Sequence, residues 1–144
     1  MLTVAGIAAT GTVGVWLGTI VFFSLIVAPR AFGVLEEDAA GKLVNAVFPI
    51  YYSFGAILGV IGVAAGIGHG VVDEFGLYLG LYLGTVILSV FIAVVSRVYL
   101  VPRIKNAGSE DNGEDGFEKY HDVSVKLNSV MLVSVAAALV FWHV

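Results

Sequence analysis

Long apolar segments alternate with short polar ones along the whole chain, and four of the apolar segments are long enough to span a membrane. They occupy residues 4–28, 43–68, 75–101 and 123–142. About 20 apolar residues of helix cross a hydrocarbon core about 30 Å thick. The pattern therefore predicts an all-α polytopic membrane protein, a four-transmembrane-helix bundle that forms one domain over residues 1–144 and has an acidic cytoplasmic loop at 105–120.

The composition agrees with a membrane protein and excludes several classes of function. Hydrophobic residues make up 59% of the chain and charged residues 12%, far from the averages for soluble domains. The absence of cysteine excludes disulfides, iron–sulfur clusters and cysteine nucleophiles. The net charge of −4 argues against nucleic-acid binding. Because the chain has no GxGxxG, Walker, HExxH or GxSxG pattern, we expect no enzyme, no metal site and no cofactor.

The basic residues predict how the helices are oriented in the cell membrane. All seven Lys and Arg residues lie in or beside the first and third loops, and the second loop and both termini have none. Cytoplasmic loops of membrane proteins collect Lys and Arg. Loops one and three are therefore expected in the cytoplasm and both termini outside it. Tyr78, Tyr82 and Trp142 would then form an aromatic belt at the outer interface.

The two halves of the chain resemble each other at the ends of their helices. Residues 27–30 read VAPR and residues 100–103 read LVPR, while residues 42–45 read KLVN and residues 126–128 read KLN. Each half would cross the membrane twice, so the match predicts two parallel two-helix repeats. Chance similarity of helix ends is the alternative.

Glycines recur at every fourth residue within the apolar segments, a spacing typical of helices that approach closely in lipid. Such ridges are predicted to be packing surfaces. Their spacing leaves open whether they serve the bundle itself or a contact with a second copy. The glycines concerned are Gly55, Gly59, Gly76, Gly80 and Gly84.

Polar residues at the start of the fourth apolar segment predict a site at the cytoplasmic end of the bundle. His121, Ser124 and Asn128 share one face of a helix, and a polar face inside a membrane is costly unless it faces the bundle interior. The face is either a cation, proton or ligand site in which His121 titrates, or a hydrogen-bonded clasp between helices.

Two residues of the second and third segments, Asn45 and Arg97, extend this candidate site. Arg97 lies five residues before Pro102 and either snorkels to the headgroups or turns inward. Pro49 frees a backbone carbonyl near the level of Asn45. The predicted binding site comprises Asn45, Arg97, His121, Ser124 and Asn128.

Four segments resemble the transmembrane protein 205-like family of uncharacterised four-helix membrane domains. They read FFSLIVAPRAF, KLVNAVFPIYYS, SRVYLVPR and FEKYHDVSVKLN. The resemblance implies a membrane protein without assigned catalysis, linked in eukaryotes to resistance to toxic metal compounds, and it favours the inward orientation of Arg97. The recurring polar positions of the family correspond here to Phe48, Pro49, Arg97, Pro102, Arg103, His121, Ser124 and Asn128.

One position departs from that family. Relatives often carry a histidine early in the first helix, where this chain has Ala5, Ala8 and Ala9. Axial ligation of haem by histidines of the first and fourth helices is therefore not expected.

Three functions remain open at this point. The leading hypothesis is a small transporter or channel-like protein for a small ion or solute, with the polar site at its cytoplasmic end. The second is a structural or accessory membrane subunit without transport or catalysis. The third is a haem- or quinone-binding membrane protein. The expected partners are the lipid bilayer and either a second copy of the chain or another membrane protein, not nucleic acid.

Overall fold

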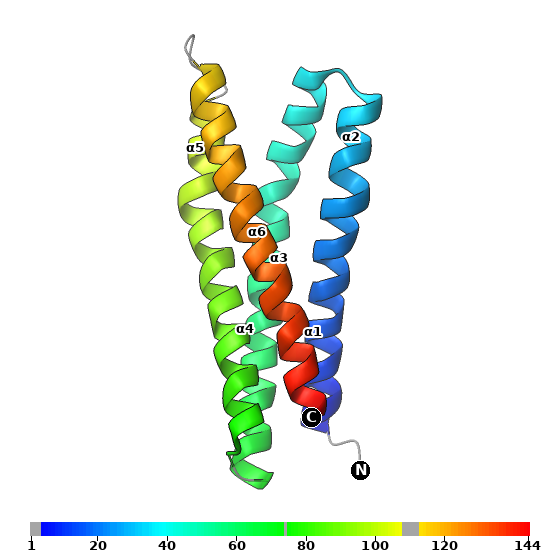
Figure 1. The fold of residues 1–144 in the computed structure, drawn as a ribbon, viewed down its shortest axis with the longest axis vertical. Coiled ribbons are helices and arrows are strands. Elements are labelled where there is room, and N and C mark those ends of the chain that lie inside the picture. The colour runs from blue at the N-terminus through cyan, green and yellow to red at the C-terminus, as the bar shows by residue number, and fades with distance from the viewer. Residues whose placement is uncertain (1–3, 74, 108–112) are drawn as a thin grey trace.

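The computed structural model describes residues 4–73, 75–107 and 113–144, which form four long helical rods (Figure 1). The first rod joins α1 (Val4–Phe22), the π-helix η1 (Phe23–Val27) and α2 (Ala28–Val34), and the second is α3 (Glu37–Asp73). The third joins α4 (Leu77–Val95), the π-helix η2 (Ser96–Leu100) and α5 (Val101–Ala107), and the fourth is α6 (Gly113–His143). These described ranges contain no strand. Because four helices are long and apolar enough to cross a membrane, the predicted all-α four-helix membrane fold is confirmed.

The rods are longer than the apolar segments that predict them. The first continues to Val34, beyond residue 28, and α3 begins at Glu37 rather than at residue 43. α5 reaches Ala107 and α6 begins at Gly113, so much of the expected acidic loop at 105–120 is helical, and residues 108–112 lie outside the described residues. Hydropathy marks the part of a helix that lies in lipid, and polar end turns continue the same hydrogen-bonded helix into water.

The first and third rods carry the same backbone irregularity, whereas α3 continues through Pro49 as an α-helix. The Ala28 N–H donates to the Phe23 carbonyl and the Val101 N–H to the Ser96 carbonyl, five residues back instead of four. In each rod a proline follows at once, at position 29 or 102. A proline ring clashes with the carbonyl four residues earlier in an α-helix. The wider π-helical turn accommodates the ring, so each rod continues past its proline.

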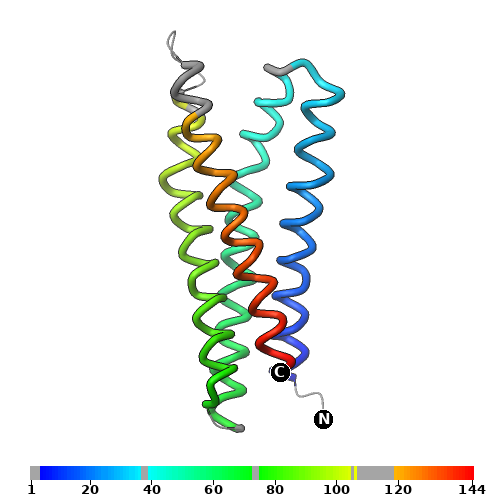
Figure 2. The backbone as a smooth tube through the Cα atoms, in the orientation of Figure 1, coloured from blue at the N-terminus to red at the C-terminus, as the bar shows by residue number. Residues whose placement is uncertain are grey.

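The rods form two hairpins that stay together at one end and separate at the other. The first hairpin comprises α1, η1, α2 and α3, and the second α4, η2, α5 and α6 (Figures 1 and 2). Near the termini, α1 and α4 each pack against both α3 and α6. Farther along, α5 still contacts α3 and α6, whereas α2 contacts α3 and, within the described helices, has no backbone contact with α6. The bundle is therefore closed at the end with the termini and open between α2 and α6 at the other.

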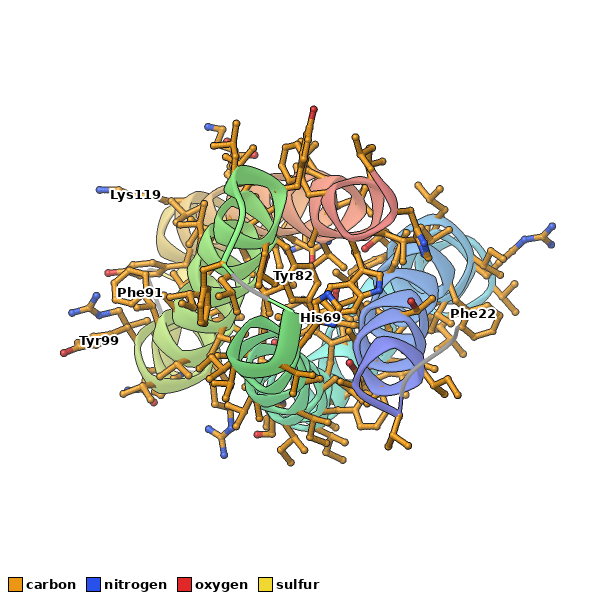
Figure 3. All side chains as sticks on the ribbon, turned by 90° about the horizontal axis from the view of Figure 1, so that it is seen from below. Phe22, His69, Tyr82, Phe91, Tyr99 and Lys119 are labelled. Atoms are coloured by element: carbon orange, nitrogen blue, oxygen red, sulfur yellow. The ribbon has the colours of Figure 1, made fainter. Side chains whose placement is uncertain are left out.

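The closed end is filled by large side chains lying on glycines. The Trp16 indole is 1% exposed, and a Cβ atom added at Gly59 would lie 2.6 Å from its Cζ3 atom. Tyr82 is fully buried, and its hydroxyl donates to the Gly62 carbonyl over 2.9 Å. Figure 3 shows Tyr82 inside the ring of helices. The predicted aromatic belt is therefore wrong for Tyr82, because its hydroxyl finds a partner inside the bundle rather than at a lipid headgroup.

The outer surface of the bundle is apolar over most of its length. Phe22, Phe91 and Tyr99 each expose more than half of their side-chain area, and they point outward from their helices in Figure 3. Such a surface suits lipid rather than water. We conclude that the chain is a multi-pass membrane protein.

Candidate ligand-binding cavity

A cavity of about 410 Å³ lies at the open end of the bundle, between the first rod, α3 and α6. Exposed residues of η1, α2 and α6, namely Leu25, Phe32 and Val125, lie at its rim. The cavity therefore opens sideways, through the gap between α2 and α6. Its volume falls in the usual range for small-molecule pockets.

The lining is mostly apolar and carries hydroxyl, amide and imidazole groups. None of the described residues that line it is Asp, Glu, Lys or Arg. Its interior would therefore disfavour an ion that had lost its water. The full lining comprises Phe23, Ser24, Leu25, Ala28, Pro29, Phe32, Val44, Phe48, Tyr51, Tyr52, His121, Ser124, Val125, Asn128, Ser129 and Leu132.

A chain of side-chain hydrogen bonds crosses this cavity. The Tyr51 hydroxyl donates to Asn128 Oδ1 over 2.6 Å, and Asn128 Nδ2 donates to the Ser24 hydroxyl oxygen over 2.8 Å. Asn128 thus connects α6 both to α3 and to η1 of the first rod. We call Tyr51, Asn128, Ser24, Tyr52 and Ser124 the polar seam.

The remaining bond of the polar seam joins two hydroxyl groups. Tyr52 and Ser124 lie 3.2 Å apart, and either hydroxyl can be the donor. Both residues are buried, at 2% exposure each. The pair has two hydroxyl hydrogens, and the bond between its members uses one of them.

An aromatic cluster forms the adjoining part of the cavity wall. The Phe23 ring centroid lies 4.9 Å from that of Tyr51 and 5.8 Å from that of Phe48. Tyr52 extends the cluster, with ring centroids 5.8 Å from Phe48 and 5.1 Å from Tyr51. These four rings hold one another at favourable tilted and edge-on angles. They form a wall with little rotational freedom.

The structure brings together three of the five residues of the predicted site. His121, Ser124 and Asn128 all line the cavity, from one face of α6. Asn45 is half-buried on α3 and does not line it. Arg97 has an exposed side chain on η2 and is likewise outside the lining.

Arg97 therefore does not occupy the inward position that the family resemblance favours. It lies on the outer side of η2, while Ser96, the residue before it, is fully buried. A long, flexible arginine side chain can extend along a helix to the headgroups, so exposure costs it little.

Three residues of the polar seam are not predicted from the sequence. Ser24 is a small hydroxyl residue within an apolar helix, and Tyr51 and Tyr52 resemble ordinary aromatic residues of a helix core. A signal does exist in the adjacent tyrosines, which follow Pro49 and lie one to two turns from Asn45. A buried tyrosine hydroxyl usually finds a hydrogen-bond partner. A tyrosine pair near the same end of the bundle as the polar face of α6 is therefore a candidate to bond with that face.

Side-chain sizes differ between the first rod, beside the cavity, and the aligned part of the third. When η1 is superimposed on η2 along the sequence, Val27 corresponds to Leu100, Ala28 to Val101 and Ala31 to Ile104. Leu100, Val101 and Ile104 are all buried. At these three positions the first rod carries the smaller residue, and Ala28 itself lines the cavity. At Phe23, which is aligned with the buried Ser96, it carries the larger one.

The predicted packing glycines divide into two groups. Gly55 and Gly59 lie against Trp16, and a Cβ at Gly55 would be 2.9 Å from its Cε2 atom. Gly76, at the N-cap of α4, and Gly80 and Gly84 within α4 are exposed. A Cβ atom added at any of them would meet no atom within 4 Å. The first group serves the bundle, and the second faces away from it.

Metal-ligating residues do not gather anywhere in the described part of the chain. Across residues 4–73, 75–107 and 113–144, no group of three or more His, Cys, Asp or Glu residues is placed to hold a metal ion. His121 is the histidine of the cavity lining. His69 lies at the other end, with its ring centroid 5.0 Å from that of Trp142.

Comparison with known proteins gives a family and a relative. The family described as "Domain of unknown function (DUF4149)" matches residues 11–112. An "Uncharacterized protein" of Aquifex aeolicus (strain VF5) is 32% identical over 126 residues, which cover 87% of each chain. No solved structure matches.

Proposed function

This chain belongs to the DUF4149 family of unknown function, and we propose that it binds a small lipid-soluble molecule between its two hairpins, without catalysing a reaction. The observation that carries this proposal is the uncharged cavity of about 410 Å³ at the open end. Its apolar lining suits a molecule that partitions into lipid, and its polar seam suits one with a polar end.

The position of the cavity supports the same kind of ligand. Its opening lies between two lipid-facing helices, α2 and α6, rather than along the axis of the bundle. A molecule dissolved in the bilayer would enter there from the side of the bundle. An ion would instead need a polar path through the closed end, where Trp16 and Tyr82 fill the interior.

Native mass spectrometry of the protein released from lipid nanodiscs tests this function. We expect one organic molecule bound per chain in the wild type and none in Ala28→Phe, whose ring would occupy the cavity. Ala64→Phe is the matched control, because Ala64 is exposed on the outer face of α3 and its ring would extend into lipid. Equal occupancy in all three proteins, or no adduct in any, would reject the proposal.

The orientation of the protein is part of the proposal. Arg30, Lys42, Arg103, Lys119 and Lys126 are all exposed around the open end, and basic residues collect on the cytoplasmic side. The cavity would then lie in the cytoplasmic leaflet of the cell membrane, with both termini outside. A C-terminal alkaline phosphatase fusion should be active and a C-terminal green fluorescent protein fusion dark; the reverse result would invert this topology.

The resemblance to the transmembrane protein 205-like family is a finer proposal about relationship. All four segments that carry it, at 22–32, 42–53, 96–103 and 117–128, lie toward the open end, and three of them contribute to the cavity lining. If that relationship holds, the cavity is what such proteins share. Transport would follow if the cavity also opened toward the other leaflet, making the protein a carrier rather than a channel.

A second candidate function, an accessory membrane subunit, is favoured by the outward glycines. Gly76, Gly80 and Gly84 leave a shallow exposed strip on which another helix, from a second copy or another membrane protein, could pack closely. Gly80→Leu should then disrupt an assembly seen by size-exclusion chromatography. Gly68→Leu, at an equally open glycine of α3, should not. A monomeric wild type, or unchanged assembly in Gly80→Leu, would count against this function.

A further inference from the structure

The cavity combines an aromatic wall with hydrogen-bond donors and a side opening. We infer that its ligand is a membrane quinone, with its ring against the aromatic cluster and its hydrocarbon chain leaving between α2 and α6. This inference rests on the proposed function and names the ligand class of the same cavity. It concerns binding alone and includes no electron transfer.

The aromatic cluster favours a flat, electron-poor ring over a flexible acyl chain. Phe23, Phe48, Tyr51 and Tyr52 present ring faces and edges held in place by their mutual contacts. The face of a phenyl or phenol ring is negative. A quinone ring, which its two carbonyls make electron-poor, stacks well on such a face. An acyl chain gains nothing from this geometry.

The polar seam can donate hydrogen bonds to carbonyl oxygens. The Asn128 amide has two N–H donors, and its bond to Ser24 uses one of them. The Tyr52–Ser124 pair has one hydroxyl hydrogen more than its mutual bond requires, for which a ligand would compete with the buried Ser96 hydroxyl beside Tyr52. No carboxylate among the described lining residues competes for these donors. Two donor groups beside an aromatic wall suit a ring that carries carbonyl oxygens.

The rim of the cavity suits the chain of such a ligand. Leu25, Phe32 and Val125 are exposed apolar residues at the opening, where α2 and α6 separate. A hydrocarbon chain leaving there passes directly into the bilayer. Since membrane quinones carry their chain on the ring, the ring can reach the polar seam while the chain remains in lipid.

Fluorescence titration with decylubiquinone tests the inference. The protein would carry Trp142→Phe, which leaves Trp16 as its sole tryptophan, and would be held in nanodiscs of quinone-free lipid. Trp16 lies against Gly55, one turn from the two tyrosines of the polar seam, so a bound quinone should quench it. We expect saturable quenching at one quinone per chain.

Two variants and one matched control assign the binding to the polar seam. Asn128→Leu and the conservative Tyr52→Phe should each weaken decylubiquinone binding by about 5- to 10-fold, the effect of losing one hydrogen bond. Tyr82→Phe also removes a buried tyrosine hydroxyl, but at the closed end, and should leave affinity within about 2-fold. Helical circular dichroism and size-exclusion profiles verify that each variant is folded.

A competition with 1-decanol, which has the chain length without the ring, distinguishes quinone binding from the binding of any small lipid-soluble molecule. Decanol that displaces decylubiquinone at equal concentration, or unchanged affinity in both seam variants, would overturn the quinone inference. An Ala28→Phe-sensitive adduct in native mass spectrometry would still support the proposed function in that case. Failure of both titration and adduct detection would overturn both.

Discussion

The first and third rods share one backbone design and differ in what they pack against. Each has a π-helical turn followed by a proline and an arginine, at 23–30 in the first rod and 96–103 in the third. The third rod stays against α3 and α6 through η2 and α5. The first leaves α6 after α1. The same local structure therefore produces a closed wall on one side of the bundle and a cavity on the other.

Side-chain volume contributes to this difference. Leu100, Val101 and Ile104 are buried on the third rod, whereas the smaller Ala28 lines the cavity beside the first. Where packing no longer holds α6, the bond between Asn128 and Ser24 connects it to the first rod. A binding cavity can thus arise in one of two similar halves by replacing large inward residues with small ones.

The largest expected effect comes from opening the closed side. Ile104→Ala should lower the free energy of unfolding by about 2–5 kcal/mol, the usual range for Ile to Ala in a packed core, because Ile104 is 1% exposed. Unfolding in sodium dodecyl sulfate followed by circular dichroism measures it. Ile87→Ala, at a position that is 53% exposed, is the control. Equal losses in the two variants would show that α5 is not tightly packed.

The next effect concerns the bond that holds the open side. Asn128→Leu removes the connection of α6 to both Tyr51 and Ser24 and should cost about 0.6–1.7 kcal/mol, the range for hydrogen bonds between helices in lipid. A double-mutant cycle with Ser24→Ala, read by the same unfolding assay, isolates the contact with the first rod. A coupling energy of zero would mean that the first rod is positioned without it.

A smaller effect is expected when Ala28 of the first rod is replaced by valine, the residue at the aligned position of the third rod. Ala28→Val adds two methyl groups next to empty space and should change the free energy of unfolding by less than about 0.5 kcal/mol. The reverse change, Val101→Ala, leaves a void next to α3 and α6 and should destabilise by at least about 1 kcal/mol. Similar values for the two substitutions would remove the distinction between an open and a closed side.

The smallest effect is expected at Arg97, which corresponds to Ser24 when the two π-helices are aligned. Since its side chain is exposed, Arg97→Gln should stay within about 0.5 kcal/mol of the wild-type free energy of unfolding and keep the bound ligand. Thermal unfolding and native mass spectrometry measure the two quantities. Loss of the ligand would mean that Arg97 reaches the cavity after all.

Hydropathy and helix periodicity predict the fold and part of the cavity. The four rods follow from apolar segments of membrane-spanning length, and the spacing of His121, Ser124 and Asn128 identifies the α6 face that lines the cavity. These properties are local, because each depends on one helix and its period. Tyr82 shows the limit: an aromatic residue near a helix end is read as a belt residue, yet it is fully buried.

Contacts between helices could not be predicted in the same way. Tyr51 reaches Asn128 across 77 positions of sequence, and nothing in either segment specifies that approach. The separation of α2 from α6 depends on the small size of Ala28 relative to Val101, which becomes apparent only when the two π-helices are aligned. The family resemblance favours an inward Arg97, but its place on the outer side of η2 depends on the phase of the helix within the irregular turn.

The most direct test of the account exchanges three residues of the first rod for the larger, buried residues of the third. A triple variant, Val27→Leu, Ala28→Val and Ala31→Ile, does this while leaving the polar seam intact. Native mass spectrometry from nanodiscs would count bound organic molecules per chain. The account predicts one molecule in the wild type and none in the folded triple variant. Full occupancy in the triple variant would contradict the claim that these small residues make the binding cavity.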